Sequence, residues 1–188
     1  MPRDYSKSPI AHQRISEYKR EDDWIRAYLR NAKIGHIATT WDEQPFITPS
    51  TFWFDEANYR IIFHSNLAGR MRANIERNPK VCLEASELGN LLPSNAALEF
   101  SLQYRSVMVF GTVRILDDPE EQRAALYGLI SKYFDMTAGE EYRPITDNEL
   151  RQTSVYALDI ESWSGKENWK TRADQTDEWP ALDKKWFD

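Results

Sequence analysis

The sequence predicts a mostly β protein whose strands run antiparallel and whose few helices lie outside the sheet. Strand-like runs follow one another with turns of only four residues, at 42–45 and 55–58. Such short connections suit hairpins and leave no room for the crossover helices of a parallel sheet. The length of 188 residues, without an internal repeat, is that of one ordinary domain.

The first predicted element is a helix that begins at Asp22. Asp22 and Asp23 suit the positive end of a helix dipole, and Ile25 and Leu29 recur at helical spacing. Runs rich in β-branched and aromatic residues follow, and turn residues separate them. They predict three strands, at residues 34–40, 46–54 and 59–64.

The second half of the chain continues this alternation of strands and helices. Residues 86–103 lack a clear period and include Gly89 and Pro93, so a long loop is predicted there. Asp118 and Pro119 open a helix, because an acidic residue and a proline both suit a first turn. The other predicted elements are strands at 81–85, 106–116 and 153–160 and helices at 69–77 and from 118 to about 133.

Composition excludes several classes of function. The net charge of -6 does not suit a protein that grips nucleic-acid phosphates, so any anion site must be local. Cys82 is the only cysteine, which excludes an internal disulfide and a multi-thiolate metal site and predicts a buried, inert thiol. No apolar run approaches a membrane span, and a cytoplasmic protein is expected. Residues 1–20 are predicted to form an N-terminal arm, 21–170 the domain and 171–188 a C-terminal tail.

The richest segment for chemistry is residues 63–71. A predicted strand ends at His64 and Ser65, and a short loop with Gly69 leads into a helix that opens with Arg70. Free backbone N–H groups at a helix start, a guanidinium and a hydroxyl form a cradle for phosphate. Two structural alternatives stay open: Arg70 as a solvated charge and Ser65 as a simple helix cap.

Two further segments fit a planar, anionic ligand. Arg105 and Ser106 lie where the predicted loop enters a strand, and Trp163 precedes Lys166 by three residues in a predicted turn. Flat aromatic rings with dispersed cations would suit a nucleotide. The structural alternatives are that Trp163 is a core residue and Lys166 a solvated end.

Together these segments resemble the FMN-binding split-barrel family of pyridoxamine 5'-phosphate oxidase, and most closely its nitroimidazole-resistance (Nim-type) branch. The resemblance rests on the order of the elements, on His-Ser…Gly-Arg at 64–70, on Ser-Val-Met-Val-Phe-Gly at 106–111 and on Ser-Gly-Lys at 164–166. It implies an antiparallel split β-barrel that forms a homodimer with two FMN sites at the interface.

The resemblance also implies roles for single residues. Ser50, Thr51 and Phe52 would run beside the isoalloxazine ring and offer it backbone groups. His64 and Ser65 would lie near the flavin and its phosphate tail. The remaining positions are Arg70 at the phosphate, Arg105 and Ser106 reaching the flavin from the other subunit, and Trp163 and Lys166 closing the site.

One position departs from the family pattern. Many members carry a lysine directly after the arginine, whereas this chain has Met71, which removes a charge from the expected phosphate site. Arg72 compensates only partly, because it points about 100° further round the helix. The arginine motif with which the oxidase binds its substrate has no counterpart after Lys166.

The expected function is therefore an FMN-dependent reductase or oxidase of a small molecule, with NAD(P)H as a possible electron donor. His64 is the candidate for a catalytic residue that donates a proton or positions substrate. Ser65 adjoins His64, but neighbouring strand residues face opposite ways, so a hydrolase is not expected. No metal is expected, since His12, His36 and His64 lack a ligand spacing. The alternatives are a non-catalytic flavin-binding protein or a relative that uses deazaflavin or haem.

Overall fold

The computed structural model describes residues 15–187, so the predicted N-terminal arm before residue 15 lies outside the described residues. The strands are β1 (Lys19–Arg20), β2 (Gly35–Trp41), β3 (Gln44–Ser50), β4 (Trp53–Asp55), β5 (Arg60–Asn66), β6 (Lys80–Leu92), β7 (Ser101–Ile115) and β8 (Thr153–Asn168). The helices are α1 (Asp22–Asn31), α2 (Arg70–Arg77), α3 (Pro119–Tyr133) and α4 (Asp147–Leu150), with 3-10 turns at Ser16–Tyr18, Ala97–Glu99 and Lys184–Trp186.

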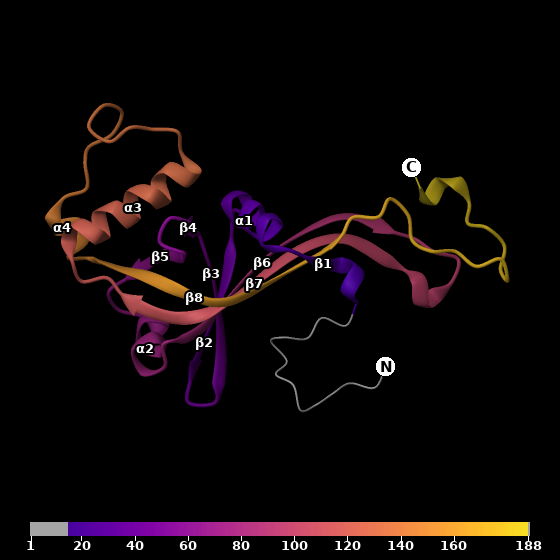
Figure 1. Ribbon diagram of the computed structural model, residues 1–188, viewed down its shortest axis with the longest axis horizontal. Helices are drawn as coiled ribbons and strands as arrows, with labels where there is room; N and C mark the ends of the chain where they lie inside the picture. Colours follow the sequence, from indigo (N-terminus) through magenta and orange to yellow (C-terminus); the bar gives the residue numbers. More distant parts are fainter. Residues whose placement is uncertain (1–14, 188) are drawn as a thin grey trace.

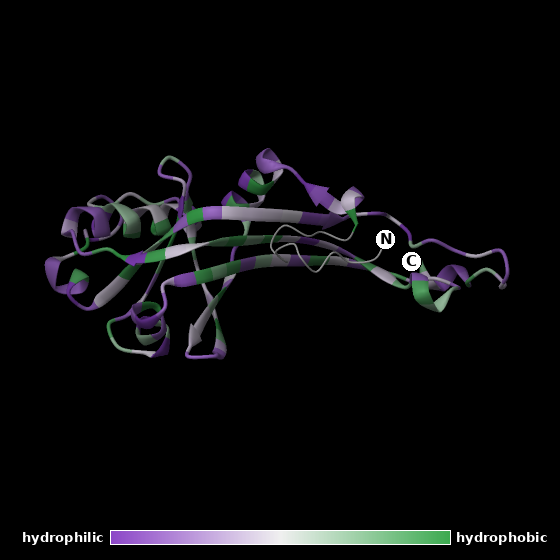
Figure 2. Ribbon diagram, turned by 60° about the horizontal axis from the view of Figure 1, so that its bottom comes forward, coloured by the Kyte–Doolittle hydropathy of each residue, from purple (hydrophilic) through white to green (hydrophobic). Residues whose placement is uncertain are grey.

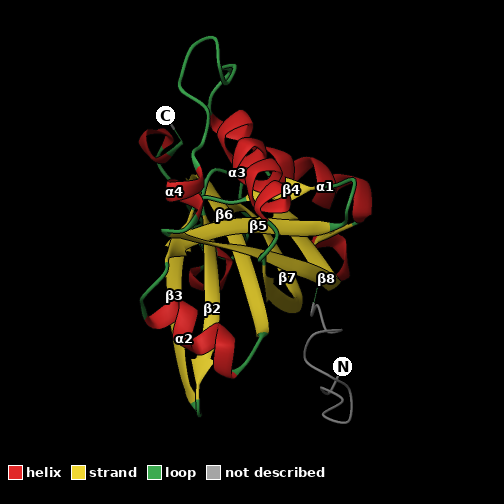
Figure 3. Ribbon diagram, turned by 90° about the vertical axis from the view of Figure 1, so that its left-hand side faces the viewer, coloured by secondary structure: helices red, strands yellow, loops and turns green. Residues whose placement is uncertain are grey.

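The strands form one antiparallel sheet in the order β3-β2-β6-β7-β8-β5-β4, and β1 pairs with the far half of β8 (Figure 1). The helices lie outside the sheet, with α3 toward the top and α2 toward the bottom in the view of Figure 3. The predicted antiparallel β fold with peripheral helices is confirmed. Among the described helices, none combines the length and apolar character that a membrane crossing requires.

The sheet is split along one side. β3 and β4 are consecutive along the chain, separated only by Thr51 and Phe52, yet they lie at opposite ends of the strand order. β4 pairs with β5 only as far as Trp53 opposite Ile62. Beyond that point β5 pairs only with β8 among the described strands. No hydrogen bonds of the sheet therefore join β3 to the second half of β5, and the barrel is open there. The prediction of one strand over 46–54 was wrong at this corner, where Phe52 lies between two strands.

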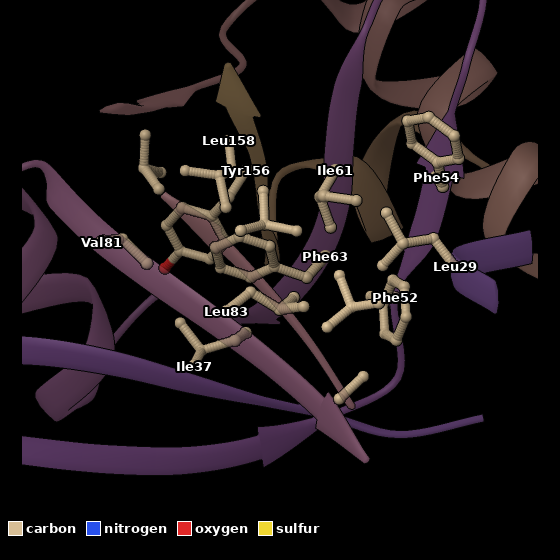
Figure 4. Close-up of a cluster of buried hydrophobic side chains, with 14 of the residues drawn as sticks. Leu29, Ile37, Phe52, Phe54, Ile61, Phe63, Val81, Leu83, Tyr156 and Leu158 are labelled. Carbon is tan, nitrogen blue, oxygen red and sulfur yellow. The ribbon is translucent and has the colours of Figure 1, made fainter. Parts of the chain in front are cut away.

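The main core lies inside the curved sheet (Figure 4). Ile37 of β2, Phe63 of β5 and Tyr156 of β8 are fully buried there. Helix α1 covers one side of this core with Ile25 and Leu29, the residues that the helical spacing singled out. The inward-facing residues therefore alternate with outward-facing residues along each strand.

A second, smaller core lies on the other face of β5 and β8. Ile62, Val155 and Ala157 pack there against Leu129 of α3. The start of α3 confirms the sequence prediction, because Asp118 accepts a hydrogen bond from the Glu121 N–H at 2.8 Å and Pro119 opens the first turn. Helix α3 thus covers the outer side of the strand that carries His64.

The predicted loop at 86–103 was wrong. β6 continues to Leu92 and β7 begins at Ser101, so the segment is mostly a β-hairpin that projects beyond the barrel as an arm (Figure 1). The alternation is broken by a register shift between Leu88 and Leu91, which hides the strand in the sequence. β8 likewise runs on to Asn168, so the turn predicted at 162–166 is a strand.

The C-terminal tail is fastened to the tip of the arm. The Ser94 hydroxyl donates to the Asp174 carbonyl at 2.7 Å, and the Asn95 side chain bonds both the N–H and the C=O of Thr176. Trp179 and Trp186 are nevertheless exposed. The tail is thus held by polar contacts to the arm tip, and it leaves these two indoles at the surface.

The buried ion pair between Asp55 and Arg60 supplies the first prediction. The Arg60 Nε lies 2.8 Å from Asp55 Oδ2, and both residues are buried. Asp55→Ala should lower the free energy of unfolding by about 3–5 kcal/mol, because it leaves a guanidinium buried with less compensation. Chemical denaturation measures the loss. Lys80→Ala, at the exposed pair with Glu161, should cost less than about 1 kcal/mol; equal losses would contradict the prediction.

Candidate functional site

The split between β3 and β5 forms the candidate site, and the start of α2 lies beside it. On β3, Thr48 pairs with the core residue Ile37, so Phe46, Thr48 and Ser50 face the inner side of the sheet and are half-buried. The Arg70 guanidinium carbon lies 4.9 Å from the centre of the Phe46 ring. The first residue of α2 thus reaches across to β3 at this end of the barrel.

Ser65 and Arg70 are both placed where they can bind an anion. The Ser65 hydroxyl lies 2.9 Å from the Tyr156 hydroxyl and donates to the Asn66 carbonyl at 2.9 Å. Arg70 is exposed, and no carboxylate of the described residues lies within ion-pair distance of it. Gly69, not Ser65, caps α2, which excludes the helix-cap alternative for Ser65.

Gly69 shapes the loop before α2 through its backbone. Its φ of 151° lies at the edge of the region that favours glycine, while a Cβ built there would meet no atom within 4 Å. Backbone conformation, rather than space, therefore favours glycine at this position. No side chain of the described residues caps the first turn of α2, and that turn holds no acidic residue. Its N–H groups and positive dipole end are open to an anion.

The structure places Met71 in the core, with 8% of its surface exposed, and not in the phosphate cradle. The second cation at this end of the barrel is Arg72. Its Nη1 donates to the Ser154 hydroxyl at 2.9 Å, and its Nε pairs with Glu76. Since Ser154 is the cross-strand partner of Ser65, Arg72 lies next to the cradle but its charge is partly compensated.

His64 and Ser65 face opposite sides of β5, as the alternation predicts. Ser65 points inward to Tyr156, whereas His64 lies opposite Val155 on the face that α3 covers. The surrounding protein lowers the pKa of His64 below its ordinary value, so the imidazole is neutral at pH 7. No hydrogen-bond partner of His64 occurs among the described residues, which leaves both ring nitrogens open to a ligand.

The backbone of Phe52 is hydrogen-bonded within the chain. Its ring is fully buried, and the Tyr133 hydroxyl lies 3.0 Å from both its N–H nitrogen and its carbonyl oxygen. The implied role of Phe52 at the ring edge stays a prediction, and a flavin there would share these backbone groups with the Tyr133 hydroxyl. Thr51 is exposed and Ser50 is half-buried, so they remain the groups of this corner that a ligand can reach.

Arg105 and Ser106 also face opposite sides of their strand. Arg105 Nε lies 2.6 Å from Glu167, its Nη1 lies 3.1 Å from Glu87, and its guanidinium stacks on Trp169 at 3.9 Å. Arg105 is thus fully engaged within the chain. Ser106 pairs with Lys166 on the outer face of the sheet, and Lys166 also pairs with Lys19 of β1. β1 lies far from α2 (Figure 1).

Lys166 and Trp163 differ in what they bind. The Lys166 ammonium lies 5.1 Å from the Tyr104 ring, and no carboxylate of the described chain pairs with it. Trp163 Nε1 donates to Asp22 at 2.9 Å, and its ring packs on Phe54 and Tyr59. Trp163 therefore anchors α1 to β8, in line with the core alternative.

Several residues of the site were missed by the sequence analysis. Tyr156 and Ser154 carried no signal, because a single hydroxyl in a buried strand resembles any core position. Tyr133 was seen only as the end of a helix. Arg72 and Ser154 also line a cavity of about 610 Å³ beside the cradle. The other lining residues are Leu67, Ile115, Leu116, Asp117, Pro119, Glu120, Gln122, Arg123, Asp147, Leu150, Arg151 and Thr153.

Metal-ligating side chains do not cluster anywhere in residues 15–187. The closest approach to a ligand geometry is His36, whose Nδ1 lies 3.0 Å from the Glu84 carboxylate on the outer face of β2 and β6. Burial raises the pKa of Cys82 to about 11, so its thiol stays protonated at pH 7. Cys82 is half-buried and not fully buried as the sequence predicted, and its protonated thiol agrees with the low reactivity expected of it.

Comparison with solved structures identifies the fold. The flavocytochrome Anf3 from Azotobacter vinelandii is 24% identical with a TM-score of 0.80, over 92% of this chain and 78% of that one. A putative 5-nitroimidazole antibiotic resistance protein from Bacteroides thetaiotaomicron is 23% identical with a TM-score of 0.67, over 79% and 86%. The FAD and haem binding protein from Mycobacterium smegmatis is 22% identical with a TM-score of 0.75, over 84% and 76%.

No curated protein sequence matches this chain. The family model for pyridoxamine 5'-phosphate oxidase, however, matches residues 21–167, which is most of the chain. This match agrees with the split sheet, with the His-Ser…Gly-Arg segment and with the solved relatives. The chain belongs to the pyridoxamine 5'-phosphate oxidase family.

Proposed function

We propose that this protein binds FMN at the split between β3 and β5 and acts as a homodimeric oxidoreductase of a small molecule. One observation carries the proposal: the unpaired Arg70 guanidinium lies at the open start of α2, next to the strand end that holds the Ser65–Tyr156 hydroxyl pair. A guanidinium, hydroxyls and free N–H groups together suit a terminal phosphate. The solved relatives described as a flavocytochrome and as an FAD and haem binding protein support a flavin.

Different residues of the chain would bind the phosphate, line the ring and handle protons around such a cofactor. The flavin, when bound, supplies hydride or electron transfer, and NAD(P)H is the expected donor. Arg70 and Ser65 hold the phosphate, and Thr51 and Ser50 line the ring. His64, whose pKa is lowered by burial, would donate a proton or position substrate from the outer side of β5.

The outer face of the sheet supports a homodimer. Ile47 of β3 is 69% exposed and Met108 of β7 is 40% exposed, and both point outward from the barrel. Leu88 and Leu91 are exposed further along β6, in the arm whose strands carry apolar (green) as well as polar positions in Figure 2. An apolar face of this extent marks a protein interface. Pairing two copies by it would carry Ser106 of each copy toward its partner, where the family pattern expects it, and Lys166 would follow as its cross-strand neighbour.

A haem is the second candidate ligand, on one specific observation. Glu84 engages Nδ1 of His36 and leaves Nε2 free, which is how carboxylates orient histidines that bind metals. The pair lies on the outer face that carries Ile47 and Met108, and one solved relative is described as an FAD and haem binding protein and another as a flavocytochrome. Haem bound through His36 would lose its absorption signature in His36→Ala and keep it in His64→Ala.

The cofactor is the first prediction for this function. Protein purified from its host should show the absorption bands of an oxidised flavin, and mass spectrometry of the released ligand should identify FMN. NAD(P)H should bleach these bands, and a nitro compound or a quinone should restore them with turnover. Turnover of no acceptor would favour a flavin-binding protein that is not an enzyme. A colourless protein that does not bind added FMN would contradict the proposal.

The phosphate cradle is tested by Arg70→Ala. FMN binding should weaken by about 1.5–3 kcal/mol, the range for a hydrogen bond to a charged group. Riboflavin, which lacks the phosphate, should bind both proteins equally, and fluorescence quenching measures both affinities. Arg77→Ala is the matched control, because Arg77 lies at the other end of α2 and pairs with Asp42. Equal FMN affinity of wild type and Arg70→Ala would place the phosphate elsewhere.

The dimer is tested by a charge on the outer face. Ile47→Lys should shift the mass measured by light scattering from dimer to monomer and weaken FMN binding with it, because a buried, unpaired ammonium opposes association. Ile34→Lys changes a residue that is 54% exposed in the connection before β2 and should leave both unchanged. A wild-type monomer with full FMN affinity would show that one chain forms the whole site.

A further inference from the structure

The corner between β3 and β4 is held from behind by the last turn of α3. The Tyr133 hydroxyl lies 3.0 Å from the nitrogen and the oxygen of Phe52 and 2.8 Å from the carbonyl oxygen of Lys33. It accepts from the N–H and donates to the carbonyls, so one side chain joins α3, the corner and the segment before β2. Because Phe52 is fully buried, solvent does not reach its amide, and loss of this hydroxyl would leave the amide without a hydrogen-bond partner.

Lys132, the residue before Tyr133, places a cation on the same corner. Its Nζ lies 3.6 Å from the centre of the Phe52 ring and donates to the carbonyl of Leu29 at 3.2 Å. Among the described residues no carboxylate lies within ion-pair distance of it. The charged or titratable groups that face it are Lys33, from the segment before β2, and Tyr133.

The electrostatics of Lys132 are unusual for a lysine. Burial, with a smaller contribution from the positive charge of Lys33, lowers its pKa from the ordinary value to about 7. Burial raises the pKa of Tyr133, so the phenol stays protonated and keeps its hydrogen atom for the carbonyls. The ammonium is therefore partly neutral at physiological pH, although it is the cation that lies against Phe52.

We propose that Tyr133 and Lys132 are positioning residues of the flavin site: Tyr133 fixes the backbone of the corner beside which the ring lies, and the charge of Lys132 makes flavin affinity depend on pH. This inference rests on the proposed function, because it places the ring beside Ser50 and Thr51. Neither side chain needs to touch the flavin. Both act through Phe52: Tyr133 holds the backbone of Phe52, and Lys132 contacts the ring of Phe52.

The direction of the pH effect follows from linkage. The carbonyl oxygens of the isoalloxazine ring carry partial negative charge. A ring next to the corner therefore favours the protonated lysine, and binding raises the pKa of Lys132. Affinity should accordingly be highest below pH 7 and fall as the pH rises through about 7, where the free protein loses this proton. The charge of the lysine acting on a partial charge of about one half, at about 10 Å in a partly solvated site, corresponds to a roughly fourfold change in affinity.

The experiment measures the dissociation constants of FMN and riboflavin between pH 5.5 and 9, a range that brackets a pKa of about 7. Riboflavin removes the titration of the phosphate from the comparison. Wild type should lose affinity for both flavins over this range, and Lys132→Met should give a flat profile with riboflavin. Tyr133→Phe should weaken both flavins about tenfold at every pH, as expected for the loss of a buried hydrogen bond, and shift the visible absorption band of the bound flavin.

Tyr127→Phe is the matched control for Tyr133→Phe. The Tyr127 hydroxyl accepts a single hydrogen bond, from the Ile145 N–H at 3.1 Å, and it lies nearer the start of α3. Affinity, pH profile and absorption band should all match wild type. Circular dichroism and thermal unfolding show that each variant folds, and Lys132→Met supplies the pH test independently of Tyr133.

The outcomes separate this inference from the proposed function. If wild type binds neither flavin, the proposed function fails and the inference fails with it. If wild type binds FMN but Lys132→Met keeps the wild-type pH profile, the inference is overturned and the proposed function stands. An unchanged affinity and absorption band in Tyr133→Phe would likewise overturn the positioning role of the hydroxyl.

Discussion

The parting of β3 from β5 below the corner at Thr51 and Phe52 is the constraint on which the rest of the structure depends. One continuous segment must supply both ends of the strand order, so the sheet closes only where β4 meets β5. Below that point each strand has one unpaired edge, and helix α2, the Arg70 guanidinium and the Phe46 ring come together there. A closed barrel would fill this space with side chains, whereas the split leaves an edge that a ligand can occupy.

The alternation of side chains along the strands then decides which residues face the split between β3 and β5. Adjacent residues that look like one motif in the sequence, His64 with Ser65 and Arg105 with Ser106, point to opposite faces. Ser65 turns to the interior hydroxyl of Tyr156, and Arg105 turns to two carboxylates. The outward residues, Ser106 above all, are the ones that another copy can meet. Only one residue of each such pair can therefore face a site between two copies, because the other points to the opposite side of the strand.

Much of this could be predicted from the sequence because it rests on local chemistry. Turn residues and β-branched runs predict the antiparallel strands, and the capping residue Asp118 predicts the start of α3. The arm at 86–103 could not be predicted, because Gly89 and the register shift after Leu88 break the period of two that identifies a strand. The roles of Tyr133 and Met71 depend on long-range packing, which no local pattern encodes.

The electrostatics explain how an acidic chain can still hold an anion. Most of the described arginines lie within ion-pair distance of a carboxylate, among them Arg60 and Arg105. Such pairs have no charge left for a ligand, and an incoming phosphate would first have to displace a carboxylate from them. Arg70 has no such competitor, and it adds its charge to the positive end of α2. A net charge of -6 therefore does not oppose binding at this point, because the field close to a small anion is set by the few groups within a Debye length and not by the total.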